Sequence, residues 1–373
     1  MRTSTCVDRD SRPGSTQSCF ASTTGAPFLL EFIVKEGYDF SCYLSRGEST
    51  FMFTRRDLLQ CTAVAGAVAA AGRLASAQTT ADAPLFPGFK ASKIQTSGAT
   101  INVVSGGRGA PVLLMHGYPQ THVLWHKIAP GLAEKFSVVA ADLRGYGDSS
   151  KPGGGEKHAS YSKRAMALDM AEVMARLGFD KFAVVGHDRG GRVAHRLALD
   201  HADKVTRLAT LDIVPTYDMF HHVNQEFATS NYHWFFLIQP APLPETLIGN
   251  SAEFFLRGRF AGLIPQAVTP EAYAEYLRCF KNPETIHATC EDYRAGASID
   301  LEHDEADLSR KIACPMFALW AEGGNTARMF DVIKTWQARA AMQVSGKGLP
   351  GRHFLPEEAP EQTLTALQAF LSS

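Results

Sequence analysis

The sequence has almost no net charge and no long uninterrupted apolar segment. Its 373 residues include 37 Lys+Arg and 38 Asp+Glu, which gives a formal net charge of −1, and 45% of the residues are hydrophobic. We expect no binding to nucleic acid, because phosphate neutralisation requires an excess of basic residues. The composition is that of a globular protein and excludes a disordered chain, a collagen-like fibre and a polytopic membrane protein.

Cysteine is sparse, and its spacing carries no metal or disulfide signature. The chain has seven cysteines, of which Cys279, Cys290 and Cys314 lie in residues 78–373. An odd number without C-x-x-C spacing predicts neither a zinc site nor a disulfide framework. The glycine run at 153–155 lacks the Lys-Ser/Thr pair of a phosphate-binding loop. We therefore expect neither a metal nor a cofactor.

The first 77 residues differ in composition from the rest. Residues 52–77 contain the pair Arg55-Arg56, then an Ala/Val/Gly run, then the small residues 75–77. This order resembles a twin-arginine export signal with a cleavage site. The apolar run is too short to span a ~30 Å hydrocarbon core. We predict a cleaved signal, a periplasmic or exported protein and no stable membrane anchor; without a functional signal the protein would be cytoplasmic.

The position of this signal is unusual, because about fifty residues precede it. Export signals lie at the extreme N-terminus, and Met52 can serve as a start. Residues 1–51 are therefore expected to be an untranslated or disordered leader. Residues 27–43 are fairly apolar, so an unusually long leader is the alternative.

Beyond residue 84, short apolar runs alternate with helical patterns. The helical pattern at 162–177, for example, ends at a glycine. Alternating strands and helices predict a doubly wound α/β core with a mostly parallel sheet. The alternation of strand and helix patterns stops at Pro215. We therefore expect core segments at 84–214 and 311–373 and a helical lid at 215–310. The predicted strands are 101–105, 112–116, 137–141, 182–186, 208–213 and 316–320.

A Gly-x-Asp-x-Gly motif, from Gly186 to Gly190, joins one of these strands directly to a helical pattern. It has the frame of a nucleophile elbow, with Asp188 where ester hydrolases carry serine. Glycines permit the strained turn and the close packing of helix on strand. The turn would present the carboxylate at a helix N-terminus. A helix N-cap is the alternative role for Asp188.

Two further motifs follow predicted strands upstream of the elbow: His116-Gly117-Tyr118-Pro119 and the segment 142–149. Together with the elbow, and in this order, they resemble the α/β-hydrolase fold. The resemblance is to the aspartate-nucleophile branch of that fold, which contains dehalogenases and epoxide hydrolases. It covers roughly residues 85–373.

The resemblance implies a two-step mechanism. Asp188 would attack a saturated carbon and form an ester, which water must then hydrolyse with the help of a base. His353 is expected to be that base, because the histidine comes last in chain order in this fold. Its acid partner is expected to be Asp212, with Glu322 as the alternative. By the pattern of the fold, the backbone N–H groups of Tyr118 and Arg189 would form the oxyanion hole.

Two arginines indicate the substrate. Haloalkane dehalogenases and most epoxide hydrolases carry tryptophan after the nucleophile, whereas this chain carries Arg189, and Arg192 follows one helical turn later. Guanidinium groups beside the nucleophile suit a substrate carboxylate, which arginine binds in bidentate fashion. The arrangement resembles haloacetate dehalogenases, including fluoroacetate dehalogenase, and implies that Arg189 and Arg192 bind the carboxylate.

The resemblance extends to the lid. His233 and Trp234 match a halide-binding pair, and Tyr293 supplies a phenol. A leaving fluoride is small and strongly hydrated, so it requires several N–H and O–H donors. Simple apolar packing is the alternative role for this aromatic cluster.

These residues predict a cofactor-independent hydrolase that converts a 2-haloacetate to glycolate and halide through an aspartyl ester. An epoxide hydrolase, which would use lid tyrosines, is the first alternative. A non-catalytic ligand-binding protein on the same scaffold is the second. The expected partner is a small-molecule haloacid, and the family resemblance implies a homodimer.

Overall fold

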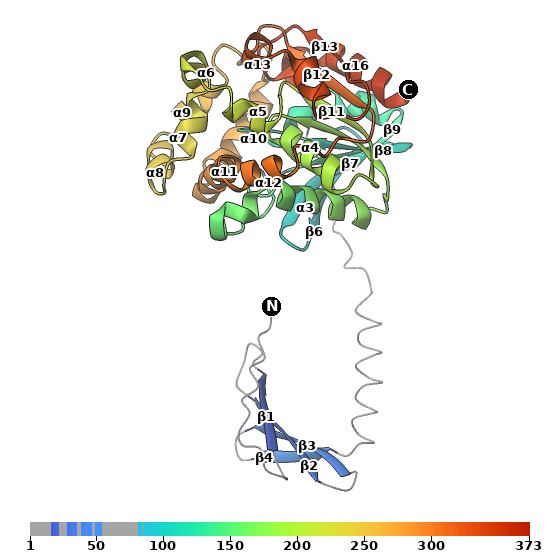
Figure 1. Ribbon diagram of the computed structural model, residues 1–373, viewed down its shortest axis with the longest axis vertical. Coiled ribbons are helices and arrows are strands. Elements are labelled where there is room, and N and C mark those ends of the chain that lie inside the picture. The colour runs from blue at the N-terminus through green and yellow to red at the C-terminus, as the bar shows by residue number, and fades with distance from the viewer. Residues whose placement is uncertain (1–15, 22–27, 36–38, 47–48, 54–80, 84) are drawn as a thin grey trace. The chain divides into compact units, whose positions relative to one another are not determined.

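The computed structural model describes residues 16–21, 28–35, 39–46, 49–53, 81–83 and 85–373. The chain divides into two units, Met1–Ala77 and Gln78–Ser373, and each is described by itself (Figure 1). The first unit contains a four-stranded antiparallel sheet in the order β1-β2-β3-β4. Its strands are β1 (Thr16–Ala21), β2 (Phe28–Lys35), β3 (Asp39–Arg46) and β4 (Ser49–Phe53).

These strands lie where the sequence predicts an untranslated or disordered leader. Strand β2 is rich in Phe, Leu, Ile and Val, residue types that favour strands, and it pairs along its length with β3. The predicted signal peptide lies outside the described residues, apart from Met52 and Phe53 at the end of β4. Export therefore stays a prediction.

The second unit is built on a nine-stranded sheet in the order β13-β12-β11-β10-β8-β9-β7-β6-β5. Strands β8 to β13 pair in parallel, and β5, β6 and β7 extend the sheet in antiparallel fashion. The strands are β5 (Ala81–Asp82), β6 (Lys90–Gln95), β7 (Thr100–Gly106), β8 (Ala110–Met115), β9 (Phe136–Ala141), β10 (Phe182–His187), β11 (Val205–Leu211), β12 (Met316–Ala321) and β13 (Ser345–Leu349).

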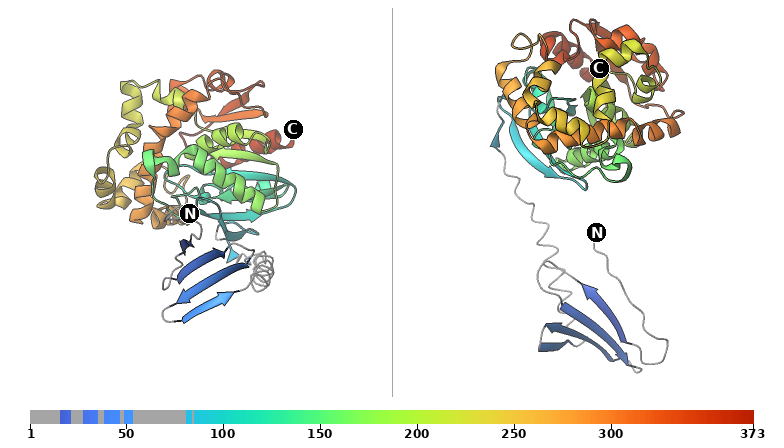
Figure 2. Two further views of the ribbon diagram at one scale, coloured as in Figure 1. Left: turned by 60° about the horizontal axis from the view of Figure 1, so that its bottom comes forward. Right: turned by 90° about the vertical axis from the view of Figure 1, so that its left-hand side faces the viewer.

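Helices cover this sheet, and β10 is buried along its whole length (Figure 2). Helix α3 begins after Ser162, whose side chain accepts from Ala165 N–H, and a left-handed Gly178 follows its end. The core helices are η1 (His122–Trp125), α2 (Ala129–Ala133), η2 (Glu156–Tyr161), α3 (Lys163–Arg176), α4 (Arg189–Asp200), α13 (Asn325–Met329), α14 (Val332–Gln337), α15 (Leu355–Glu358) and α16 (Pro360–Ser372).

All regular secondary structure between β11 and β12 is helical, in the segment expected to form the lid. In Figure 1 these yellow and orange helices gather at one end of the sheet. They are α5 (Thr216–Phe220), α6 (Gln225–Ser230), α7 (Tyr232–Leu237), α8 (Leu243–Gly249), α9 (Ala252–Arg259), α10 (Pro270–Phe280), α11 (Pro283–Gly296) and α12 (Ile299–Ala306). Within the described residues, no helix has the length and apolar character needed to cross a membrane.

The predicted fold class is confirmed. All six strands expected from the sequence are present, with ends that differ by a few residues. The sequence did not indicate β6 and β13, which alternate buried with exposed or half-buried positions and so lack a continuous apolar run.

Candidate active site

Asp188 occupies the sharp turn between β10 and α4. Its backbone has φ 47° and ψ −117°, a region that non-glycine residues rarely adopt. The turn requires neighbours without side chains: a Cβ on Gly117 would collide with the Asp188 carboxylate, and one on Gly190 with the backbone carbonyl of His116. The elbow predicted from the Gly-x-Asp-x-Gly motif therefore has the expected strained geometry.

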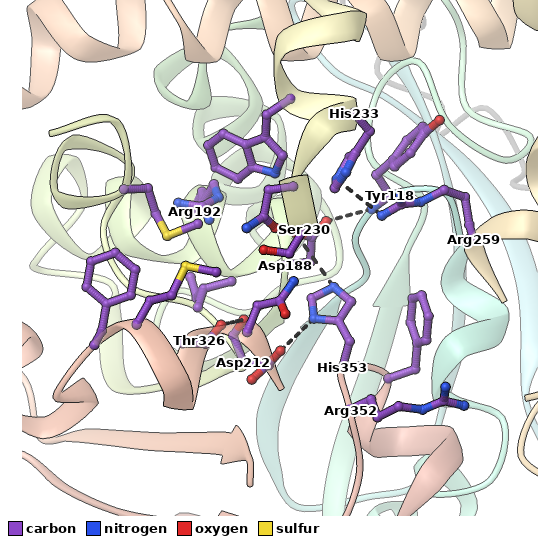
Figure 3. A pocket seen from close by; sticks show the side chains of 18 of the residues that line it. Tyr118, Asp188, Arg192, Asp212, Ser230, His233, Arg259, Thr326, Arg352 and His353 are labelled. Carbon is purple, nitrogen blue, oxygen red and sulfur yellow. Dashed lines mark hydrogen bonds and ion pairs between the residues drawn. The ribbon is translucent and has the colours of Figure 1, made fainter. Parts of the chain in front are cut away.

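His353 follows β13 and faces Asp188. Its Nδ1 lies 2.6 Å from Asp212 Oδ2, and its Nε2 lies 4.0 Å from Asp188 Oδ2 (Figure 3). With the Nδ1 proton donated to Asp212, the Nε2 lone pair is directed towards Asp188. Glu322, the alternative acid, is exposed and makes no contact with His353 among the described residues.

Asp212 is itself held in place by the core. Its Oδ1 accepts from Ala321 N–H at 3.0 Å, and its backbone carbonyl accepts from the Thr326 hydroxyl at 3.1 Å. The loop that carries His353 is fixed by Glu358, whose Oε1 accepts from the backbone N–H groups of His353 and Phe354. The predicted acid and the predicted base are thus both held in place by hydrogen bonds within the protein.

The two oxygens of Asp188 have different surroundings. Oδ1 accepts from the backbone N–H of Tyr118 at 2.9 Å, whereas Oδ2 is the oxygen nearest His353. Burial raises the pKa of Asp188, but the charges of His353, His187 and the two arginines outweigh it and lower the pKa to about 2. The carboxylate is therefore ionised at neutral pH, which its predicted role as a nucleophile requires.

One of the two predicted oxyanion-hole donors contacts the Asp188 carboxylate in the structure. The backbone N–H of Tyr118 donates a hydrogen bond to Asp188 Oδ1. The backbone N–H of Arg189 forms no hydrogen bond to the Asp188 carboxylate; both residues belong to the described part of the chain. Because a reacting carboxylate changes geometry at its carbon, we expect this second donor to align when the tetrahedral intermediate forms.

Arg189 differs most from its predicted role. Its side chain is fully buried and forms a bidentate ion pair with Asp292 of α11, with Nε to Oδ2 and Nη2 to Oδ1 both at 2.9 Å. It does not line the cavity beside Asp188. Its Nη1 is buried and has no hydrogen-bond partner among the described residues. The sequence could not reveal this, because a lid helix supplies the partner.

Arg192 lines the cavity beside Asp188. The side chain is 4% exposed, donates from Nη1 to Val214 O and to the Thr216 hydroxyl, and forms no salt bridge with any described residue. Burial, together with repulsion from Arg189, lowers its pKa to about 10. Arg192 is thus a buried cation that an anionic ligand would stabilise.

The three predicted halide donors line the same cavity. His233 and Trp234 come from α7 and Tyr293 comes from α11. The Tyr293 ring lies edge-on to both partners, with centroids 5.8 Å from His233 and 5.9 Å from Trp234. The indole Nε1 and the phenol oxygen form no hydrogen bond with the described residues, so both are available to a ligand.

The comparisons with known proteins agree with this geometry. A family model described as alpha/beta hydrolase fold matches residues 110–358. A fluoroacetate dehalogenase from Burkholderia sp is 45% identical over 291 residues, covering 77% of this chain and 95% of the relative. The chain belongs to the α/β-hydrolase family. The predicted membership of its haloacetate dehalogenase family is confirmed by the same similarity.

Two further proteins, one with an activity in its name and one described by its fold, are also similar to this hydrolase. A soluble epoxide hydrolase from Corynebacterium sp. (strain C12) is 34% identical over 297 residues, covering 74% of this chain and 94% of the relative. A crystal structure from Nostoc sp PCC 7120, described as an alpha/beta hydrolase, has a TM-score of 0.75 and 59% identity, covering 76% of this chain and 98% of that one.

The cavity of the hydrolase has a volume of about 130 Å³. A single water needs roughly 10–15 Å³ by this measure, so the space suits a small organic molecule. Arg259 of α9 also lines it, a residue that the sequence did not single out because the lid has no recognisable motif there. The other lining residues include Ile213, Met219, Ser230, Asn231, Asn325, Met329, Phe330 and Arg352. No group of side chains suited to a metal ion occurs in the described segments.

Proposed function

We propose that this hydrolase converts a 2-haloacetate and water to glycolate, halide and a proton. The observation that carries the proposal is Arg192, a buried guanidinium without a carboxylate partner in the cavity that contains the Asp188 nucleophile. A neutral haloalkane or epoxide would leave this cation uncompensated, whereas a substrate carboxylate would pair with it.

In the first step, Asp188 Oδ2 attacks the halogen-bearing carbon in line. The new C–O bond forms as the carbon–halogen bond breaks, and the halogen leaves with the bonding electron pair. Trp234, Tyr293 and His233 offer neutral donors to that anion. Such donors accelerate the step because they bind the leaving halide more strongly than the carbon-bound halogen.

In the second step, water hydrolyses the ester on Asp188. His353 Nε2 removes a proton from the water, which attacks Cγ, and the resulting imidazolium is stabilised by Asp212. Negative charge develops on Oδ1, the oxygen that already accepts from Tyr118 N–H. As the intermediate collapses, the ester C–O bond breaks and the imidazolium gives its proton to the departing alkoxide, which leaves as glycolate. The carboxylic acid left on Asp188, with one oxygen from water, then loses a proton to solvent and becomes the carboxylate again.

The test assays four substrates in parallel: halide release from fluoroacetate, chloroacetate and a 1-chloroalkane, and diol formation from an epoxide. We expect turnover of the haloacetates alone. Turnover of the epoxide alone would support the first alternative, for which the 34% identical epoxide hydrolase and the phenol of Tyr293 in the cavity are the supporting observations. No turnover of any substrate would favour a ligand-binding protein.

A further inference from the structure

Arg259, the last residue of α9, lies on the opposite side of Asp188 from Arg192 in Figure 3. Its Nη2 is 3.3 Å from Nε2 of His233, and its Nε is buried with no hydrogen-bond partner among the described residues. It forms no salt bridge within the described chain. Arg259 is therefore a second cation at this cavity that no protein carboxylate neutralises.

This contact determines which nitrogen of His233 carries the proton. A guanidinium has only donors, so His233 Nε2 must accept and the proton of the neutral ring must reside on Nδ1. Nδ1 in turn is buried and has no partner among the described residues. The ring is 6% exposed and packs against Tyr118 and Tyr293. A buried N–H donor with nothing to bind in the protein is suited to a ligand anion.

The charge of His233 is consistent with that assignment. Burial first, and then the charge of Arg259, hold the pKa of His233 well below its ordinary value. The ring is therefore neutral while the enzyme turns over, and only its tautomer is left to be chosen. A free neutral imidazole would exchange its proton between the two nitrogens, which would remove the donor from the cavity part of the time.

We propose that Arg259 is a positioning residue that locks His233 in the Nδ1–H tautomer, and so provides a permanent donor and added positive charge for the departing halide. The inference rests on the proposed dehalogenation. It deepens that function by assigning the leaving-group side of the cavity to Arg259 and His233, opposite the carboxylate side at Arg192.

The expected consequence depends on the halide. Fluoride is the poorest leaving group of the halides and the strongest hydrogen-bond acceptor, so its departure relies most on donors in the transition state. We expect Arg259→Met to lower kcat on fluoroacetate by roughly tenfold to a hundredfold, the usual range for one lost charge-assisted donor. On bromoacetate, whose bond breaks more easily, the loss should be below about threefold.

The experiment uses the full-length protein and three variants. Arg259→Met removes the guanidinium, Arg259→Lys keeps the charge and can only donate, and Arg257→Met is the control. Arg257 belongs to the same helix and carries the same charge, but its side chain is 62% exposed, pairs with Glu253 and does not line the cavity. We expect the Lys variant to fall between wild type and the Met variant on fluoroacetate, and Arg257→Met to match wild type.

A second readout is independent of turnover. Nitrogen-15 spectra of the histidine rings, with the His233 signal assigned from His233→Asn, report the tautomer directly. Nδ1–H in wild type and an exchanging ring in Arg259→Met would support the proposal. An unchanged tautomer, or equal losses on fluoroacetate and bromoacetate, would overturn it. If wild type releases no halide from either substrate, the proposed function fails, while the spectra still decide the role of Arg259.

Discussion

The guanidinium of Arg189, one residue after the elbow aspartate, is paired in bidentate fashion with Asp292 of lid helix α11, and both side chains are fully buried. Asp292 also accepts from the Tyr146 hydroxyl and binds Lys163. A residue expected to bind substrate thus joins the lid to the turn that carries the nucleophile. The lid and the elbow are consequently parts of one buried electrostatic network.

Asp292→Asn should destabilise the protein strongly. The change leaves Arg189 and Lys163 buried with no full counter-charge at Asp292, and breaking a buried pair typically costs about 3–5 kcal/mol in the free energy of unfolding. Urea denaturation of the variant and wild type measures the difference. A loss below about 1 kcal/mol would show that this pair does not hold the lid to the core.

Arg192→Met should discriminate between charged and neutral substrates. We expect kcat/KM on chloroacetate to fall roughly tenfold to a hundredfold, because a buried charge-assisted hydrogen bond to the carboxylate is lost. Chloroacetamide, which has no negative charge, is the matched control and should be little affected. Arg192→Lys should restore little, because an ammonium lacks the planar fork. Equal losses on both substrates would assign Arg192 to packing alone.

His353→Gln should separate the two chemical steps. Asp188 can still form the ester, but no base activates water, so mass spectrometry should detect a carboxymethyl adduct on Asp188 after addition of chloroacetate. Asp188→Asn should form none. In a single turnover of wild type in oxygen-18 water, the label should enter Asp188 rather than glycolate. Label in glycolate after the first turnover would indicate direct attack of water on the substrate.

Ester hydrolysis should weaken on the acid side as His353 becomes protonated, because the protonated ring cannot act as a base. In the free enzyme burial lowers the pKa of His353, but its hydrogen bond to Asp212 and the charges of Asp212 and Asp188 outweigh burial and raise it. Esterification removes the charge of Asp188, so in the ester the hydrogen bond and charge of Asp212 alone oppose burial, and the rate falls as the pH drops through the resulting pKa. In Asp212→Asn the acid limb of the pH–rate profile should move to lower pH, and the rate of ester hydrolysis should fall. Single-turnover kinetics across pH measure both.

Glu357 should make the protein less stable as the pH rises. Burial raises the pKa of this carboxyl to about 8, against the opposing hydrogen bonds from Tyr276 and Gln120. The unfolded chain releases the proton near pH ~4.3, so the free energy of unfolding should fall by about 1.4 kcal/mol per pH unit from there to about pH 8. Glu357→Gln should remove this slope, and Glu361→Gln, at an exposed site, should not. Identical slopes in all three proteins would contradict the prediction.

Local patterns in the sequence were sufficient for the core and for much of the site. Strand β10 is a continuous apolar run, and Asp188 lies between Gly186 and Gly190, where a Cβ would not fit. Both features are visible in a short stretch of sequence, so the elbow could be recognised without a structure. The chain order of nucleophile, acid and histidine then indicated Asp188, Asp212 and His353. The sequence left the choice between Asp212 and Glu322 open, because both residues follow strands and only their distance from His353 distinguishes them.

Tertiary structure decided what the charged side chains contact. Residue type and spacing placed Arg189 and Arg192 on one helical turn. In the structure, however, the Arg189 guanidinium pairs with Asp292, whereas Arg192 lines the cavity. Arg259 gave no signal, since its partner His233 lies on another lid helix. The physical reason is that helix and strand formation depend on neighbours along the chain, whereas the role of a buried charge depends on the counter-charge and donors that reach it from distant segments.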